Sequence, residues 1–219
     1  MSENTTRRGL LKGALGAAVA GSMGLVGWLA GEEGRPSGVT LRPPGALGEE
    51  AFLSACTRCF KCSSACPNDC IETFDLRAGL GKAFTPYIKA RTSGCVLCGE
   101  CAAVCPTGAL KPFVASREGW LASVAMGTAR VNKEMCFSYH GRTCGACYQA
   151  CPLAGMAMKI GVFETPIVIA ENCVGCGLCE QACLHLPQAI RVVPNRSGLP
   201  MPGRAGEDRP NNVVARKPA

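Results

Sequence analysis

Hydrophobic positions in this chain fall in short runs that alternate with polar, cysteine-rich loops. The runs have the length and composition of short strands, and a short helical turn is expected after the fourth cysteine of each loop. Such a pattern predicts an α+β fold of short strands, short helices and long loops. The clearest strand-like runs are Ala109–Lys111, Pro166–Ala170 and Ala189–Val193.

Three segments depart from this alternation. Apolar side chains recur four residues apart from Trp120 to Val124, which predicts a short amphipathic helix, and we assign residues 118–133 to a connecting helix. Residues 36–50 are rich in Pro and Gly and show no periodicity, so we expect an extended linker there. From residue 194 onward the composition predicts a flexible tail over residues 194–219.

The first 35 residues have the features of an export signal. Residues 6–12 contain the pair Arg7-Arg8, a twin-arginine (Tat) pattern. The apolar stretch Ala14–Ala30 spans 17 residues, whereas a transmembrane helix needs about 20. We therefore expect a Tat signal over residues 1–35 and a periplasmic location. An uncleaved anchor at the inner membrane is the alternative.

Sixteen of the 17 cysteines form four similar groups, which make an internal repeat. Three groups have the spacing C-x2-C-x2-C-x3-C, and the third group has seven residues between its first two cysteines. A proline follows the fourth cysteine in groups one to three, and Leu184 takes this place in group four. The groups are Cys56, Cys59, Cys62, Cys66; Cys95, Cys98, Cys101, Cys105; Cys136, Cys144, Cys147, Cys151; and Cys173, Cys176, Cys179, Cys183.

This spacing is the one by which bacterial ferredoxins bind [4Fe–4S] clusters. Three thiolates two residues apart can hold one cubane, and the fourth cysteine reaches a second cluster. Zinc sites use pairs of cysteines separated by a dozen or more residues, and neither His140 nor His185 completes a haem-attachment motif. The sequence therefore predicts four [4Fe–4S] clusters, bound by the sixteen cysteines in two tandem bacterial-ferredoxin-like modules over residues 51–117 and 134–193.

Two questions about the cysteines stay open in the sequence. The groups can pair in sequential order, or in a nested order in which group one pairs with group four. We favour the sequential order, in which Cys105 and Cys66 complete the first and second clusters and Cys183 and Cys151 complete the third and fourth. Cys70 is the seventeenth cysteine, and we expect a buried or spare thiol there instead of a ligand.

Charge and the remaining motifs exclude several function classes. The formal net charge of +7 counts every thiol as neutral, but a loaded [4Fe–4S]²⁺ site with four thiolates carries about −2. Four such sites bring the protein close to neutrality, and basic and aromatic residues do not interleave, so nucleic-acid binding is disfavoured. No paired carboxylates, nucleophile–base set or phosphate loop stands out. We predict an electron-transfer protein without a small-molecule substrate.

Several details resemble the NapG/MauM family of ferredoxin-type proteins. The resemblance implies a periplasmic carrier that takes electrons from quinol through a membrane-bound ferredoxin-type partner. It also implies delivery to a periplasmic oxidoreductase of a nitrate reductase or methylamine dehydrogenase system. A maturation factor for a periplasmic redox enzyme and an electron-transfer subunit of a molybdenum enzyme are the alternatives. The details are the twin-arginine start, Ser37–Ala46, the stretched group with Cys144–Leu153, Cys183-Leu184 and Gln188–Ile190.

Overall fold

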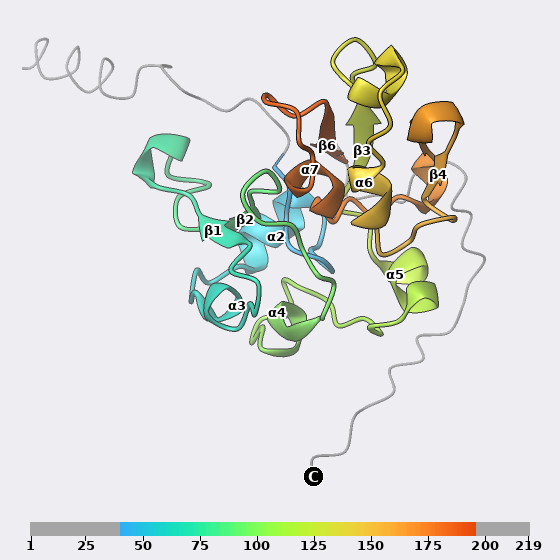
Figure 1. Cartoon of the computed structure of the whole chain (residues 1–219). Coiled ribbons are helices and arrows are strands. Elements are labelled where there is room, and N and C mark those ends of the chain that lie inside the picture. Colours follow the sequence, from blue (N-terminus) through green and yellow to red (C-terminus); the bar gives the residue numbers. More distant parts are fainter. Residues whose placement is uncertain (1–39, 196–219) are drawn as a thin grey trace, which may run out of the picture. The chain divides into compact units, whose positions relative to one another are not determined.

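The structure is a computed structural model that describes residues 40–195 (Figure 1). The export signal expected over residues 1–35 lies outside the described residues. The tail expected over residues 194–219 also lies outside them from residue 196 onward. Its first two residues belong to the fold instead, because Pro194 pairs with Gly127 and the Asn195 amide donates to the Ala125 carbonyl at 3.2 Å. No helix within residues 40–195 is long and apolar enough to cross a membrane.

Two short antiparallel pairings organise the first half of the described chain. Strand β1 (Ile71–Thr73) pairs with β2 (Pro86–Ile88) between the first two cysteine groups. An isolated antiparallel bridge between Ala46 and Leu110 brings the beginning and the end of this half together. Its helices are α2 (Glu49–Ala55), α3 (Lys61–Ser64), the 3₁₀ turn η1 (Leu76–Ala78) and α4 (Glu100–Ala103).

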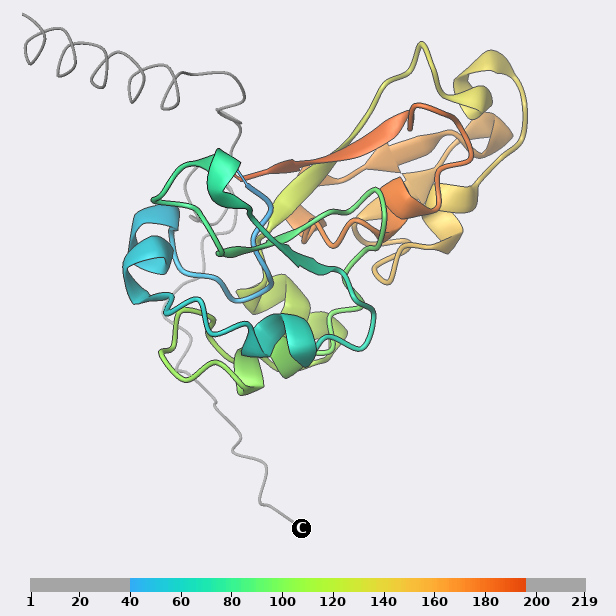
Figure 2. The same ribbon diagram turned by 90° about the vertical axis from the view of Figure 1, so that its left-hand side faces the viewer.

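The second half repeats this plan with an inner and an outer pairing. Strand β4 (Met158–Ile160) pairs with β5 (Pro166–Val168), and β3 (Gly127–Val131) pairs with β6 (Ile190–Pro194), both antiparallel. Figure 2 shows β3 and β6 side by side in yellow-green and orange. Its helices are α6 (Ala146–Gln149) and α7 (Leu178–Gln181), with 3₁₀ turns η2 (Phe137–His140), η3 (Val162–Glu164) and η4 (Ala170–Asn172).

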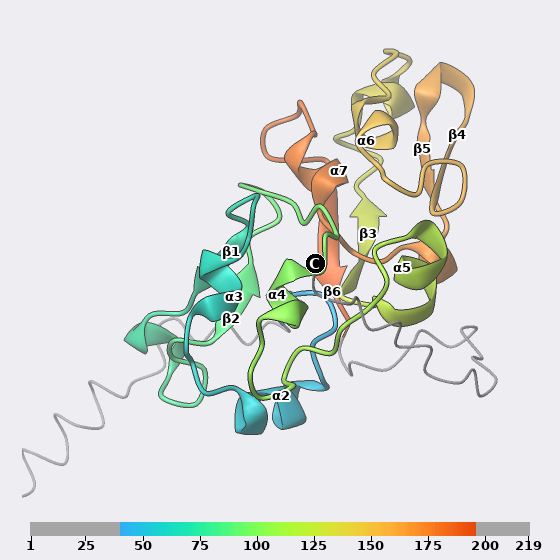
Figure 3. The same cartoon turned by 90° about the horizontal axis from the view of Figure 1, so that it is seen from below.

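Helix α5 (Arg117–Ser123) connects the two halves (Figure 3). Ser116 caps it, because its side-chain oxygen accepts a hydrogen bond from the Gly119 N–H at 3.1 Å. The expected connecting helix over 118–133 is wrong in its second part. Val124 is extended, and the chain continues into β3. The strand forms because β6, which is distant in sequence, supplies its hydrogen bonds. Local periodicity does not reveal such a distant partner, so it predicted a helix here.

The segment expected to be an extended linker, residues 36–50, is part of the folded unit in its described portion. Residues 41–44 are buried, and the Lys111 N–H donates to the Gly45 carbonyl at 2.7 Å. Gly45 has φ of 79°, and a Cβ atom there would collide with the Lys111 carbonyl oxygen. This segment therefore holds, in the first half, the outer position that β3 holds in the second.

One apolar cluster extends across both halves. Phe52, Leu97 and Leu110 of the first half belong to the same buried cluster as Val124 and Leu153. A smaller cluster around Met158 and Ile190 lies in the second half. Because the larger cluster draws on both halves, each half buries part of its apolar surface against the other.

The buried side chain of Arg42 holds residues 42–49 against the rest of the first half. Its guanidinium donates to both carboxylate oxygens of Glu49, at 2.9 and 2.7 Å. It also donates to the Thr85 hydroxyl at 2.9 Å and to the Pro86 carbonyl at 2.7 Å. Only 6% of Arg42 is exposed, and its charge lies 4.7 Å from the centre of the Phe52 ring. This one side chain thus joins residues 42–49 to the strand β2.

Replacing Arg42 with alanine should lower the free energy of unfolding by about 3–5 kcal/mol, because it leaves buried polar partners unpaired. Lys82→Ala is the matched control. Lys82 contacts the same carboxylate only at 3.9 Å, so its loss should cost less than about 1 kcal/mol. Urea unfolding followed by circular dichroism measures both. Equal effects of the two variants would contradict the anchoring role of Arg42.

Candidate metal centres

Three cavities are each lined by four cysteines drawn from two groups. We name these groupings set I, set III and set IV. Each cavity takes the first three cysteines of one group and the fourth cysteine of another. Set I is Cys56, Cys59, Cys62 and Cys105; set III is Cys136, Cys144, Cys147 and Cys183; set IV is Cys151, Cys173, Cys176 and Cys179.

The remaining predicted ligands lie together in a fourth place, set II, which consists of Cys66, Cys95, Cys98 and Cys101. Burial raises the pKa of Cys101 to about 12, and the neighbouring Cys98, Cys62 and Cys66 raise it further through their charge. Cys66 and Cys95 both contact the thiol of Cys70. Because Cys62 of set I is near enough to act on Cys101 of set II, the two sets are neighbours.

The fourth cysteine of every group lies with the cysteines of its sequence neighbour. Cys105 joins group one, and Cys183 and Cys151 exchange between groups three and four. These positions match the sequential order and not the nested one. The longer spacing of group three, with seven residues between its first two cysteines, keeps Cys136 in the site, because residues 137–140 turn back as η2 and Cys136 still lines the cavity.

The loops curl round each set through backbone conformations that favour glycine. The residue after the second cysteine has positive φ in all four groups: Phe60 at 61°, Gly99 at 85°, Gly145 at 60° and Gly177 at 86°. A one-turn helix begins directly after it and ends before the fourth cysteine, so the helical turn expected after the fourth cysteine is wrong. Phe60 is the exception among the four, because it adopts the left-handed conformation without being glycine.

Backbone N–H groups point at the sulfur atoms from the cysteine loops and from strand β3. The Leu97 N–H donates to Cys95 Sγ at 3.4 Å, and the Ala129 N–H donates to Cys173 Sγ at 3.3 Å. At Cys105, burial acts to raise the pKa, but hydrogen bonds from the backbone of Leu110, Thr107 and Ala109 outweigh it and lower the pKa. Such donors stabilise negative sulfur, which is the form that binds iron.

Burial separates two inner sets from two outer sets. Of the sixteen grouped cysteines, the buried ones are Cys95 and Cys101 of set II and Cys176 and Cys179 of set IV, whereas Cys59 of set I is exposed. Burial raises the pKa of Cys176 to about 12. Without iron these buried thiols hold their protons tightly, so iron must displace the protons when it binds.

Electrostatic proximity within each half and one hydrogen bond between the halves place the sets in the order I, II, IV, III. Cys62 of set I raises the pKa of Cys101 in set II by its charge, after the larger effect of burial. Cys147 of set III acts in the same way on Cys179 of set IV. Between the halves, the Cys95 N–H donates to the Cys176 carbonyl at 2.7 Å. The two inner sets therefore meet at the junction between the halves.

Each of three cavities offers four thiols to one bound group. Within residues 40–195, no three His, Cys, Asp or Glu side chains converge as they would around a single metal ion. The four thiols of sets I, III and IV instead line cavities with mostly apolar walls. A cubane with four separate iron corners needs ligands in this arrangement, so the residues present fit [4Fe–4S] clusters.

Cys70 belongs to the same region as set II. Its Sγ lies 3.5 Å from Cys66 Sγ. A hydrogen bond with Cys95 lowers the pKa of Cys70 to about 7 and raises the pKa of Cys95. The spacing rules of the four groups do not include this residue, and its only signal in the sequence is that it is a seventeenth cysteine.

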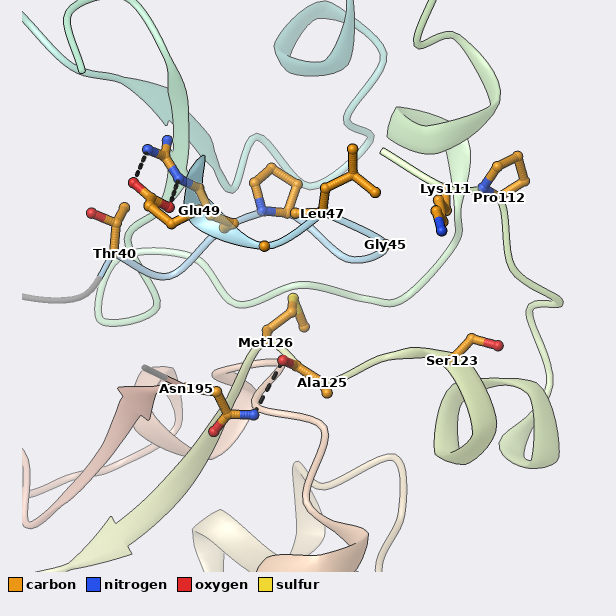
Figure 4. A pocket seen from close by; sticks show the side chains of 14 residues that line it. Thr40, Gly45, Leu47, Glu49, Lys111, Pro112, Ser123, Ala125, Met126 and Asn195 are labelled. Atoms are coloured by element: carbon orange, nitrogen blue, oxygen red, sulfur yellow. Dashed lines mark hydrogen bonds and ion pairs between the residues drawn. The ribbon is translucent and has the colours of Figure 1, made fainter. Parts of the chain in front are cut away.

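A cavity of about 420 Å³ without cysteines lies between residues 40–49 and 123–126 (Figure 4). Two pairs of lining residues bond to one another: Arg42 pairs with Glu49, and the Asn195 amide donates to the Ala125 carbonyl at 3.2 Å. We assign it no part in the metal centres.

Models of iron–sulfur families match all four cysteine groups at least in part. A 4Fe-4S dicluster domain matches residues 55–109, which contain groups one and two. Two 4Fe-4S binding domains match residues 142–154 and 170–184. The described fold and these matches agree on ferredoxin-type iron–sulfur domains built from small helices and short strands.

Similar proteins extend the match over most of the chain. The chain is 37% identical over 191 residues to the ferredoxin-type protein NapG of Escherichia coli, with 80% of each covered. It is 36% identical over 213 residues to the methylamine utilization ferredoxin-type protein MauM of Methylobacillus flagellatus, covering 93% of this chain and 86% of that protein. The MauM of Methylophilus methylotrophus is 38% identical over 175 residues, with 74% of each covered.

Because each set combines cysteines of two groups, the sets predict which cysteine variants affect the same cluster. Cys105→Ala and Cys59→Ala should change the same EPR signal, because both residues line the cavity of set I, and Cys98→Ala should change a different one. Each variant should lose up to about four irons, the content of one cluster. Redox-poised EPR and iron analysis of anaerobically purified protein measure this. The assignment is wrong if Cys105→Ala changes the signal that Cys98→Ala changes.

Proposed function

We propose a function for this chain on the premise that it belongs to the family of ferredoxin-type iron–sulfur electron carriers that includes NapG and MauM. In our proposal the chain holds four [4Fe–4S] clusters, one in each of sets I to IV. It passes electrons between a quinol-oxidising membrane partner and a periplasmic oxidoreductase.

The order of the four sets is the observation that carries this proposal. A bound [4Fe–4S] cluster gains or loses one electron, and hydrogen bonds and burial set its potential. Sets II and IV lie at the junction of the halves, and their most buried cysteines are shielded from water. Sets I and III lie outside them in the order of contacts. Two inner and two outer sites suit a chain of clusters in which each outer cluster exchanges electrons with one partner.

The chain's own residues prepare each site for negative charge. Backbone N–H groups donate to ligand sulfurs, as Leu97 does to Cys95. The apolar cluster that contains Leu97 and Leu110 keeps water from the inner side of the sites. Because the two halves share this cluster and the bond from Cys95 to Cys176, the separation between sets II and IV is fixed by the fold.

The likeness to these relatives is the basis on which we propose the partners and the location. The names of the relatives associate them with methylamine utilization or identify them as ferredoxin-type proteins. We propose that the twin-arginine segment directs the folded, loaded chain to the periplasm, where it works beside the inner membrane. A membrane-bound ferredoxin-type protein supplies electrons from quinol, and a soluble redox enzyme of a nitrate or methylamine system receives them.

Iron analysis and quinol-driven reduction test the proposal. Anaerobically purified protein should contain about sixteen irons per chain, four for each cluster. A quinol analogue should reduce it only when solubilised membranes of the native host are present. An iron content far below this value would contradict the four clusters. Reduction at the same rate without membranes would contradict the membrane partner, and no reduction in their presence would favour an assembly role.

Removing cysteines of an inner set should interrupt electron transfer between the two halves. In a Cys176→Ala/Cys179→Ala variant, quinol with membranes should reduce the clusters of one half and leave those of the other half oxidised. The reason is that set IV connects set III to the rest. Rapid-freeze EPR separates the signals. Removal of an outer set by Cys56→Ala/Cys59→Ala is the control. It leaves sets II, IV and III connected, so the clusters of these three sets should be reduced together or, if set I receives the electrons, not at all. Rapid reduction of both halves in the first variant would exclude a single linear path.

A further inference from the structure

A fifth thiol lies at set II, and the electron-carrier function does not use it. Cys70 is 3% exposed. Its Sγ lies 3.5 Å from Cys66 Sγ, which is non-bonded contact between two sulfur atoms. Its thiol also forms a hydrogen bond with Cys95. Cys70 thus contacts one proposed ligand of set II, Cys66, and interacts with a second, Cys95.

The surrounding loop holds Cys70 in this position. Asn68 donates from its side-chain amide to the Ser93 hydroxyl at 3.0 Å and to the Gly94 carbonyl at 2.7 Å. Ser93 in turn donates to the Asn68 carbonyl at 2.7 Å. Residues 93 and 94 directly precede Cys95, so these bonds fix the loop of Cys70 against the loop of set II.

A turn before Cys70 and strand pairing after it also fix the backbone of this residue. Asp69 has φ of 45° and turns the chain. Ile71 then begins β1 opposite Ile88, and its carbonyl accepts a hydrogen bond from the Ser63 hydroxyl at 2.8 Å. The Cys70 backbone is therefore held between a turn and a strand, and its side chain has little freedom to leave the site.

The equivalent position in the other groups has no sulfur. Four residues after the fourth cysteine, the chain has Ala109 in group two, Gly155 in group three and Pro187 in group four. Gly155 is the direct counterpart, because Cys151 completes set IV as Cys66 completes set II. A Cβ atom at Gly155 would meet open space. Set II therefore has five thiols, whereas its counterpart, set IV, has four.

We propose that Cys70 is a reserve ligand of set II, able to take the iron that Cys66 binds. This rests on the proposed function, because it requires a cluster in set II. In the exchange the bond from Cys66 Sγ to iron breaks and a bond from Cys70 Sγ to the same iron forms. The proton of the Cys70 thiol passes to Cys66, and no electron is gained or lost. Because the two sulfurs are already in contact, only the side chains need to move.

Removing Cys66 alone, and then together with Cys70, tests the proposal. Cys66→Ala should keep about sixteen irons and the EPR signal of set II, with Cys70 as the ligand. Cys66→Ala/Cys70→Ala should lose that signal and up to about a quarter of the iron, the share of one cluster in four. Cys70→Ala alone should keep all the iron, because Cys66 remains.

Cys151→Ala is the matched control in the other half, where no fifth thiol is present at the corresponding position. It should lose the set IV signal as the double variant loses that of set II. Equal losses in Cys66→Ala and Cys151→Ala would overturn the reserve role while leaving the four-cluster function intact. Cys98→Ala separates the two claims: if it changed neither iron content nor EPR, set II would hold no cluster and both claims would fail.

A second replacement covers the case in which the alanine variant does not fold. Cys66→Ser keeps the size of the side chain, and the set II signal should stay like that of the wild type, since a cysteine thiolate still binds each iron. Adding Cys70→Ala should then change the signal or remove it. A Cys66→Ser signal that does not respond to the second substitution would also overturn the reserve role.

Discussion

The exchange of fourth cysteines between neighbouring groups is the constraint on which the rest of this fold depends. A site that takes three thiols from one loop and one from another can form only if the two loops face each other. Cys105 must return to the loop of Cys56, and Cys66 must reach the loop of Cys95. The short antiparallel pairs and one-turn helices serve this purpose, because they reverse the chain within few residues. Extensive sheets and long helices are not needed when ligands hold the loops together.

The two halves repeat one plan, but they do not form independent units. Leu97 and Leu110 share an apolar cluster with Val124 and Leu153, and the Cys95 N–H binds the Cys176 carbonyl. Trp120 of α5 adds a hydrogen bond to the Leu97 carbonyl at 3.1 Å. These contacts bring together the two inner sets. The packing that stabilises the chain is thus the same packing that determines the order of the sites.

The sequence was most informative where chemistry fixes the spacing. The four cysteine groups follow from what a cubane needs. The same pattern misplaced the one-turn helices, which lie before the fourth cysteine of each group, as α3 lies before Cys66. The structure departs from expectation where distant partners decide. Residues 41–47 and β3 take their hydrogen bonds from segments far away in the chain, which local composition cannot reveal. Cys70 has no spacing rule, so only the fold shows that it lies beside Cys66.

Because each set combines cysteines of two groups, the sets also become complete in a fixed order during translation. All the cysteines of sets I and II have been translated once residue 105 is made, and Leu110 then closes the outer bridge of the first half. Set III begins at Cys136 but remains incomplete until Cys183, the last of the grouped cysteines. A chain that met its iron–sulfur donor at the ribosome would therefore acquire cofactors from the N-terminal half onward. Truncation after residue 182 would leave set III one ligand short, while sets I and II would keep every ligand.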